Sequence, residues 1–179
     1  SDSFAIINAD DKNSKFMVQN CLSKIKTFGI KNLADNNAKI LEIDFSGMLL
    51  KINNKEFWTP LIGKFNVSNL LAVFSVANVA GIKSIEILRI LSQTKGANGR
   101  FEILKTPNNA FVIIDYAHTP NGLENVIDTI SQIRTKNELF VTIIGCGGDR
   151  DSGKRSKMGK IVLNGCDKVI FTSDNPRYE

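Results

Sequence analysis

Hydrophobic and polar positions follow two different periods along the first third of the chain. The apolar run Phe4–Ile7 ends abruptly at polar residues and predicts a buried strand. Apolar residues at helical spacing then predict a helix whose inner face carries Met17, Cys21, Leu22 and Ile25. Residues 38–45 and 48–58 are typical of extended segments, with turn signals at 46–47 and 53–54. We therefore expect antiparallel strands at one side of a first domain.

Two helices are predicted after the loop 60–66. The apolar face of the first, which ends at Gly81, consists of Val67, Leu70, Leu71, Phe74 and Ala77. The second helix has Ser84 as its N-cap and directs inward Ile85, Leu88 and Leu91. Lys95–Gly99 is glycine-rich and poor in apolar residues, so we expect a domain boundary there.

The last part of the chain alternates strands and helices. Residues 111–114, 140–144 and 169–171 are continuous apolar runs, which predicts a parallel sheet covered on both faces. The helix after the first run has Thr119 as its cap and Pro120 in its first turn. Its apolar face consists of Leu123, Val126, Ile127, Ile130 and Ile133. A shorter helix carries Met158, Ile161 and Val162 and ends at Gly165. The predicted fold class is α/β with parallel strands.

Composition and charge exclude several classes of protein. The 179 residues are 42% apolar, yet no apolar run reaches the roughly 18–20 residues of a membrane span. The charge of +5 is mild and its lysines are scattered, so we expect neither a nucleic acid nor a membrane as partner. Three cysteines without C-x-x-C spacing favour a reducing, cytoplasmic location. A single histidine argues against a His-based metal site.

Each of the three late apolar runs is followed by a loop rich in polar residues. The carboxyl ends of parallel strands meet at one edge of a sheet, where ligands bind. The second loop is Gly145–Asp151. The overlapping stretch Gly148–Lys154 has the spacing of a phosphate-binding G-x-x-x-x-G-K loop. We reject that motif because Arg155 replaces the required Ser or Thr, and because two Asp residues would face the phosphates. A complete G-x-G-x-x-G motif is also missing from the sequence.

The third loop contains Asp174, Asn175, Pro176 and Arg177. Arg177, together with Arg150 of the second loop, could clamp a carboxylate through paired hydrogen bonds. Asp174 and Asn175 could accept hydrogen bonds from an ammonium group, so the set suits a zwitterionic amino acid. The alternative is an Asx-Pro turn with a solvated arginine.

Four other positions suit a nucleotide, and each has a structural alternative. Asp115 could bind a ribose hydroxyl or be a loop carboxylate, and His118 could contact a nucleotide or cap a helix. Asn66 and Asn69 lie one helical turn apart and could read an adenine edge or cap the helix. Arg100 follows the glycine-rich boundary and could reach a phosphate or lie on the surface.

Five motifs in this order resemble those of the Mur ligase family, and in particular its diaminopimelate-adding branch. They are Gly63–Ala72, Gly99–Glu102, Asp115–Pro120, Gly145–Asp151 with Lys154-Arg155 and Met158-Gly159, and Asp174–Arg177. Asn8–Asp11 is also similar to that family, whereas residues 30–58 carry none of its motifs.

The resemblance implies an ATP-dependent, Mg²⁺-requiring, ADP-forming amide ligase of peptidoglycan biosynthesis. It would add meso-diaminopimelate to UDP-N-acetylmuramoyl-L-alanyl-D-glutamate through an acyl phosphate, and we expect a monomer. By this resemblance, residues 1–97 correspond to the later part of a central ATP-binding domain. Residues 98–179 correspond to the first part of a Rossmann-like C-terminal domain that binds the amino acid.

The same resemblance implies roles for single residues. ATP would be bound by Asn66, Asn69, Arg100, Asp115 and His118. Diaminopimelate would be bound by Arg150, Asp174, Asn175, Pro176 and Arg177. The family's phosphate-binding loop, its Mg²⁺ ligand and its carbamylated lysine would lie before residue 1. We therefore expect an excerpt of a longer enzyme, with no catalytic residue, no metal ligand and no activity of its own.

Two alternatives remain open. The chain could come from a lysine-adding relative, whose amino acid lacks the distal carboxylate that Arg177 would bind, or from a folylpolyglutamate synthase-like relative. It could also be a non-catalytic, receiver-like binding module, in which Asp10, Asp11 and Asp115 form the acidic cluster.

Overall fold

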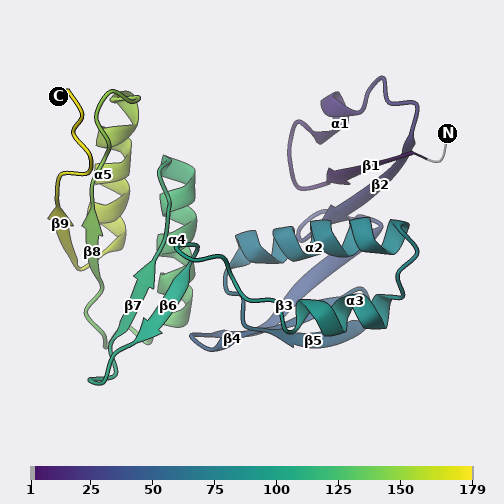
Figure 1. Ribbon diagram of the computed structural model, residues 1–179, viewed down its shortest axis with the longest axis horizontal. Helices are drawn as coiled ribbons and strands as arrows, with labels where there is room; N and C mark the ends of the chain where they lie inside the picture. Colours follow the sequence, from purple (N-terminus) through teal and green to yellow (C-terminus); the bar gives the residue numbers. More distant parts are fainter. Residues whose placement is uncertain (1–2, 179) are drawn as a thin grey trace. The chain divides into compact units, whose positions relative to one another are not determined.

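The computed structural model describes residues 3–178, and the chain divides into two compact units, residues 1–96 and 97–179. Figure 1 labels their elements along the chain. The first unit contains β1 (Phe4–Asn8), α1 (Ser14–Met17), β2 (Lys24–Gly29), β3 (Asn36–Asp44), β4 (Gly47–Ile52), β5 (Lys55–Thr59), α2 (Lys64–Val79) and α3 (Ser84–Leu91). The second contains β6 (Glu102–Lys105), β7 (Phe111–Ile114), α4 (Pro120–Ile133), β8 (Val141–Ile144), α5 (Gly153–Gly165) and β9 (Lys168–Phe171).

The first unit is built on a five-stranded sheet in the order β1-β2-β3-β4-β5. β1, β2 and β3 pair in parallel, whereas β3, β4 and β5 form an antiparallel meander. The expected antiparallel strands are therefore confirmed, with their turns near the expected positions. The helix α2 packs against β1, β2 and β3, and α3 packs against α2 and β5 (Figure 1).

The helices of the first unit bury the stripe that the sequence pattern indicates, with one exception. The core combines strand residues with the α2 side chains Val67, Leu70, Leu71 and Phe74. In α3 the buried residues are Ile87, Leu88 and Leu91, while Ile85, which was expected inside, is 65% exposed. The N-cap is Lys83, so Ser84 is the first helical residue rather than the cap. Ile85 lies off the stripe that faces the sheet.

The predicted helix around residues 17–25 is wrong. Only one helical turn, α1, is present, and Ile25 lies in β2, which pairs in parallel with β1. Met17 is 73% exposed and Leu22 101% exposed, so the helical spacing buries no common face. From Lys24 to Phe28, pairing with β1 overrides the local period because it gives backbone N–H and C=O groups of this strand their partners.

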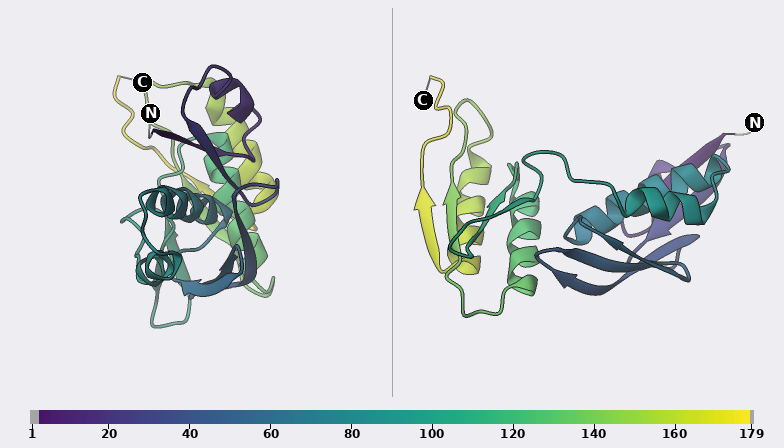
Figure 2. Two further views of the ribbon diagram at one scale, coloured as in Figure 1. Left: turned by 90° about the vertical axis from the view of Figure 1, so that its right-hand side faces the viewer. Right: turned by 60° about the horizontal axis from the view of Figure 1, so that its bottom comes forward.

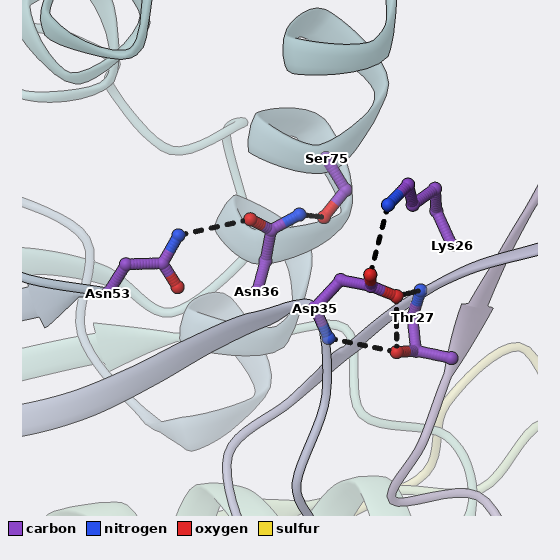
Figure 3. Close-up of polar contacts among 6 residues, drawn as sticks. All are labelled: Lys26, Thr27, Asp35, Asn36, Asn53 and Ser75. Carbon is purple, nitrogen blue, oxygen red and sulfur yellow. Dashed lines mark hydrogen bonds and ion pairs between the residues drawn. The ribbon is translucent and has the colours of Figure 1, made fainter.

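Two polar networks join β2, β3 and α2 in the first unit (Figure 3). The Asp35 carboxylate accepts hydrogen bonds from the Thr27 backbone N–H and hydroxyl and from the Lys26 ammonium, at 2.9–3.0 Å. The Thr27 N–H, then the Lys26 and Thr27 side chains, lower the pKa of Asp35 to about 2. Beside it, the buried Asn36 donates to the Ser75 hydroxyl at 3.0 Å and accepts from the Asn53 amide at 3.1 Å.

The second unit has a parallel pair of strands and an antiparallel hairpin. β8 and β9 pair in parallel in register, with Ile144 opposite Phe171. The helices α4 and α5 pack on each other through a buried cluster of Leu123, Ile127, Met158 and Val162. Partly buried side chains from one face of β8 and β9 pack against this cluster. Figure 2 shows α5 beside these two strands. The Thr119 cap and the Pro120 start of α4 are confirmed.

Two expectations for the second unit need correction. β7 pairs antiparallel with β6, which the sequence pattern did not reveal, and within residues 3–178 it forms no ladder with β8. The short β6–β7 connection makes this local pairing entropically inexpensive. In addition, the far face of β8–β9 is not covered by the described chain, since Val141, Ile143 and Ile170 are 41–69% exposed.

The predicted fold class, α/β with parallel strands, is confirmed for the part of the chain that the structure covers. No helix within residues 3–178 is both long and apolar enough to cross a membrane.

Candidate functional site

The loops that follow β8 and β9 lie against each other in the second unit. The ladder continues past the strands, because the Thr172 backbone N–H donates to the Ile144 carbonyl at 3.0 Å. Further along, the Gly148 N–H donates to the Asn175 carbonyl at 3.0 Å. Gly145–Asp151 and Asp174–Arg177 are therefore brought together, as expected for the carboxyl ends of parallel strands.

Glycine is required where these two loops touch. A Cβ atom on Gly145 would lie 2.9 Å from both the Asp174 Cβ and the Thr172 carbonyl oxygen. A Cβ atom on the buried Gly148 would collide with the carbonyl group of Pro176. The glycines of this loop thus allow one backbone to approach another, and they set the position of the Asp174–Arg177 turn.

The side chains expected to bind an amino acid are on the surface of these loops. Arg150 and all of Asp174–Arg177 are exposed, and both Asn175 and Arg177 have positive φ values, 23° and 54°. Among residues 3–178, no hydrogen bond or ion pair joins Arg150, Arg177 and Asp174 to one another. Two guanidinium groups and one carboxylate at neighbouring loops therefore remain available to a ligand.

A second group of side chains gathers at the end of β7. The Asp115 carboxylate accepts the Phe101 backbone N–H at 2.8 Å, which holds the chain next to Arg100. The Arg100 guanidinium lies over the Tyr116 ring at 4.6 Å from its centroid. The His118 ring lies 5.1 Å from Tyr116, and its Nδ1 is 3.0 Å from the Tyr116 carbonyl oxygen. The structure thus brings together Arg100, Asp115 and His118.

Three residues of this region were missed as site residues by the sequence reasoning. Tyr116 is the platform under Arg100. Lys154 and Arg155, in the first turn of α5, donate to the carbonyl oxygens of His118 and Gly147 at 2.8 and 3.3 Å. An aromatic residue directly after a strand-end carboxylate, and a basic pair at a helix start, are the sequence signals that could have found them.

Asn66 and Asn69 belong to the first unit. They share one face of α2, because the Asn69 Nδ2 lies 3.5 Å from the Asn66 Oδ1. The Asn66 Nδ2 donates to the Ile62 carbonyl at 2.9 Å, so Asn66 has a structural contact in the loop before the helix. Asn66 is half-buried and Asn69 is exposed, which leaves mainly Asn69 accessible to a ligand.

Asp10 is occupied by the protein's own backbone. Its carboxylate accepts the N–H groups of Ile30, Lys31 and Asn32 at 2.6–3.2 Å. Partial burial raises the pKa of Asp10, but these three bonds outweigh it and the pKa lies below its ordinary value. Residues 3–178 contain no group of three His, Cys, Asp or Glu side chains able to hold a metal ion.

Comparison with protein families gives two adjacent matches. The Mur ligase middle domain matches residues 1–77, and the Mur ligase glutamate ligase domain matches residues 99–179. The first match includes the stretch 30–58, in which we recognised no motif.

Curated relatives match almost the whole chain. A UDP-N-acetylmuramoyl-L-alanyl-D-glutamate--2,6-diaminopimelate ligase of Phocaeicola vulgatus is 46% identical over 176 residues, which is 98% of this chain and 36% of the relative. A protein of the same name from Bacillus velezensis is 42% identical over 98% of the chain and 36% of its own length. The chain thus spans little more than a third of these relatives.

Solved structures agree. A UDP-N-acetylmuramoyl-L-alanyl-D-glutamate--2,6-diaminopimelate ligase is 34% identical, with a TM-score of 0.65 over 99% of this chain and 38% of that one. An Acinetobacter baumannii UDP-N-acetylmuramoylalanyl-D-glutamyl-2,6-diaminopimelate--D-alanyl-D-alanyl ligase, 20% identical, shares the fold with a TM-score of 0.79 over 96% of this chain and 39% of that one. With two adjacent domain matches and relatives aligned along nearly its whole length, the chain belongs to the Mur ligase family.

Proposed function

We propose that this chain is part of an ATP-dependent, ADP-forming ligase of peptidoglycan biosynthesis. It would add meso-diaminopimelate to the D-glutamate γ-carboxyl of UDP-N-acetylmuramoyl-L-alanyl-D-glutamate. The names of the similar ligases support this substrate pair. The observation that carries the proposal is the juxtaposition of Arg150 with the Asp174–Arg177 turn through the Gly148–Asn175 hydrogen bond.

The chemistry of the amino acid explains this set of side chains. Diaminopimelate has a carboxylate and an ammonium group at each end, and one amine must remain free to attack. Arg177 and Arg150 would bind the distal carboxylate, since a guanidinium group can donate two parallel hydrogen bonds to it. Asp174 and the carbonyl of the Asn175 side chain would accept from the distal ammonium, and Pro176 would keep the turn rigid.

The residues at the end of β7 suit a nucleotide. The Arg100 guanidinium stacks on the face of the Tyr116 ring, so the N–H groups of Arg100 can donate to a phosphate. Asp115 uses its Oδ2 for the Phe101 N–H, and within residues 3–178 its other oxygen accepts no hydrogen bond, which suits a ribose hydroxyl. His118 would border the same ligand, and Asn66 and Asn69 would contact the adenine. Bound ATP supplies the phosphoryl group that activates the γ-carboxyl.

The proposal extends to the cellular setting and to the metal. Three free cysteines suit a reducing cytoplasm, where we place the enzyme as a monomer. We assign no Mg²⁺ ligand to this chain and propose that residues elsewhere in the longer enzyme hold the ion. The sequence has no G-x-x-x-x-G-K-[ST] loop, so the 179 residues alone should not turn over ATP.

The test is an ADP-release assay with the full-length enzyme and the UDP-linked dipeptide. We expect release that depends on meso-diaminopimelate and is at least tenfold slower with L-lysine at equal concentration. Faster ADP release with lysine than with diaminopimelate would contradict the role of Arg177. If neither amino acid stimulated ADP release, the ligase assignment would be contradicted. Turnover by the isolated 179-residue chain would contradict the proposed dependence on a separate phosphate-binding loop.

A further inference from the structure

Two adjacent basic residues in the first turn of α5 bind two different loops of the second unit. The Lys154 ammonium donates to the His118 carbonyl oxygen at 2.8 Å, in the segment that follows β7. The Arg155 Nη2 donates to the Gly147 carbonyl oxygen at 3.3 Å, in the segment that follows β8. Consecutive helical side chains point in different directions, so one turn of α5 can hold both loops at once.

Both acceptors are backbone carbonyl groups. A cation that binds a carbonyl oxygen fixes the path of the main chain, whatever side chains that segment carries. Lys154 and Arg155 are both half-buried, which limits their freedom to move away from these acceptors. Their effect on a ligand would therefore act through the loops that they hold.

The two loops carry the two halves of the proposed site. His118 is in the segment with Asp115 and Tyr116, on the nucleotide side. Gly147 precedes Gly148, whose N–H binds the Asn175 carbonyl in the amino-acid-binding turn. A continuous series of contacts thus runs from His118 through Lys154 and Arg155 to Asn175.

We propose that Lys154 and Arg155 are positioning residues of the ligase: Lys154 holds the nucleotide-binding segment and Arg155 holds the loop that supports the amino-acid-binding turn. The inference rests on the proposed function and assigns a role to two residues that touch neither ligand in it. Because the pair shares one helical turn, it also fixes the spacing between the two loops. Residues that hold ligand-binding groups in place without touching the ligand commonly affect affinity as much as the residues that contact it.

The experiment uses the full-length ligase and measures KM and kcat for each substrate separately. Wild-type activity with diaminopimelate is established first, because its absence would contradict the proposed function and not the positioning roles. Lys154→Met should raise the KM for ATP on the order of 3- to 10-fold, the range for one charge-assisted hydrogen bond at a partly exposed site. The KM for diaminopimelate should change less than twofold.

Arg155→Met should show the opposite split, with a raised KM for diaminopimelate and little change for ATP. Lys154→Arg and Arg155→Lys keep a cationic donor and should restore most of the lost affinity. Lys157→Met removes the same charge from an exposed position of α5 and should change neither KM. If Arg155→Met does not fold, the Lys154 variants and Arg155→Lys still test the split.

If Lys154 and Arg155 only stabilised the fold, their substitution would lower the melting temperature and change the KM values of both substrates alike. Equal changes in the two KM values, or no change in either, would overturn the proposal. Failure of Lys154→Arg to recover affinity would also overturn it, because a positioning donor needs only to reach the His118 carbonyl.

Discussion

The backbone N–H of Gly148 lies 3.0 Å from the carbonyl oxygen of Asn175 and donates a hydrogen bond to it. This bond ties the loop after β8 to the turn after β9, and no side chain intervenes at Gly148. The turn that carries Arg177 is therefore positioned by the backbone of a loop that lies about 30 residues earlier in the sequence. Substitutions in one loop should consequently change the affinity for a ligand bound by the other loop.

Gly148→Ala should displace the Asp174–Arg177 turn, which we propose binds the amino acid. The added methyl group would collide with the Pro176 carbonyl, and this overpacking should displace the turn at a cost of about 1–3 kcal/mol. In the full-length ligase we expect the KM for diaminopimelate to rise on the order of tenfold, with the KM for ATP nearly unchanged. Gly159→Ala is the matched control, since its Cβ would meet nothing within 4 Å. In the middle of α5 it should instead stabilise by about 0.5–1 kcal/mol.

Arg177→Lys should weaken diaminopimelate binding. A single ammonium group cannot reproduce the two parallel N–H donors of a guanidinium, so we expect a loss of about 1.5–3 kcal/mol, measured by calorimetric titration of the full-length enzyme. Arg89→Lys, at an exposed position of α3, is the control and should leave the affinity unchanged. An unaltered dissociation constant in Arg177→Lys would remove this residue from the site.

Asp35→Asn should flatten the acid dependence of stability. The folded-state pKa of Asp35 is about 2, below the ordinary 3.8, so the unfolded chain binds more protons in this range. The stabilisation is present above about pH 4 and is lost as the pH falls towards 2. We expect the variant to be slightly less stable at pH 6 and to lose less stability on acidification. The pair is 39–44% exposed, so the effect should be small.

The measurement is urea unfolding between pH 2 and 6, followed by the fluorescence of Trp58, the single tryptophan of the chain, which lies in β5 of the same unit. Glu42→Gln, at an exposed position of β3, serves as the control. Parallel pH profiles for wild type and Asp35→Asn would show that this carboxylate does not stabilise the fold.

Asn36→Ala should destabilise the first unit by about 1–3 kcal/mol. Asn36 is 9% exposed and Ser75 is fully buried, so the change leaves the Ser75 hydroxyl and the Asn53 amide without their partner. Trp58 fluorescence during urea unfolding gives the free energy. Asn78→Ala, at an exposed position of α2, should stay within about 0.5 kcal/mol of wild type. Equal effects of the two substitutions would mean that the buried network contributes nothing specific.

Local pattern predicted the elements whose period agrees with their burial. The meander β3–β5 was recognised from its turn signals, and α4 from its cap and its apolar stripe. It failed at β2, where apolar spacing suggested a helix but pairing with β1 decides the structure. It also missed β6, which at four residues carries little periodic signal and forms through its hairpin with β7.

The sequence by itself determined which chemical groups lie at the strand ends: two arginines, an Asp-Asn-Pro turn and a glycine-rich loop. These follow from local residue order, because a strand and the loop after it are contiguous. The tertiary structure alone decided which groups meet: the stacking of Arg100 on Tyr116, the Gly148–Asn175 bond, and the reach of Lys154 and Arg155 to two loops. Such contacts join segments that are distant in sequence, and sheet register and helix packing set them.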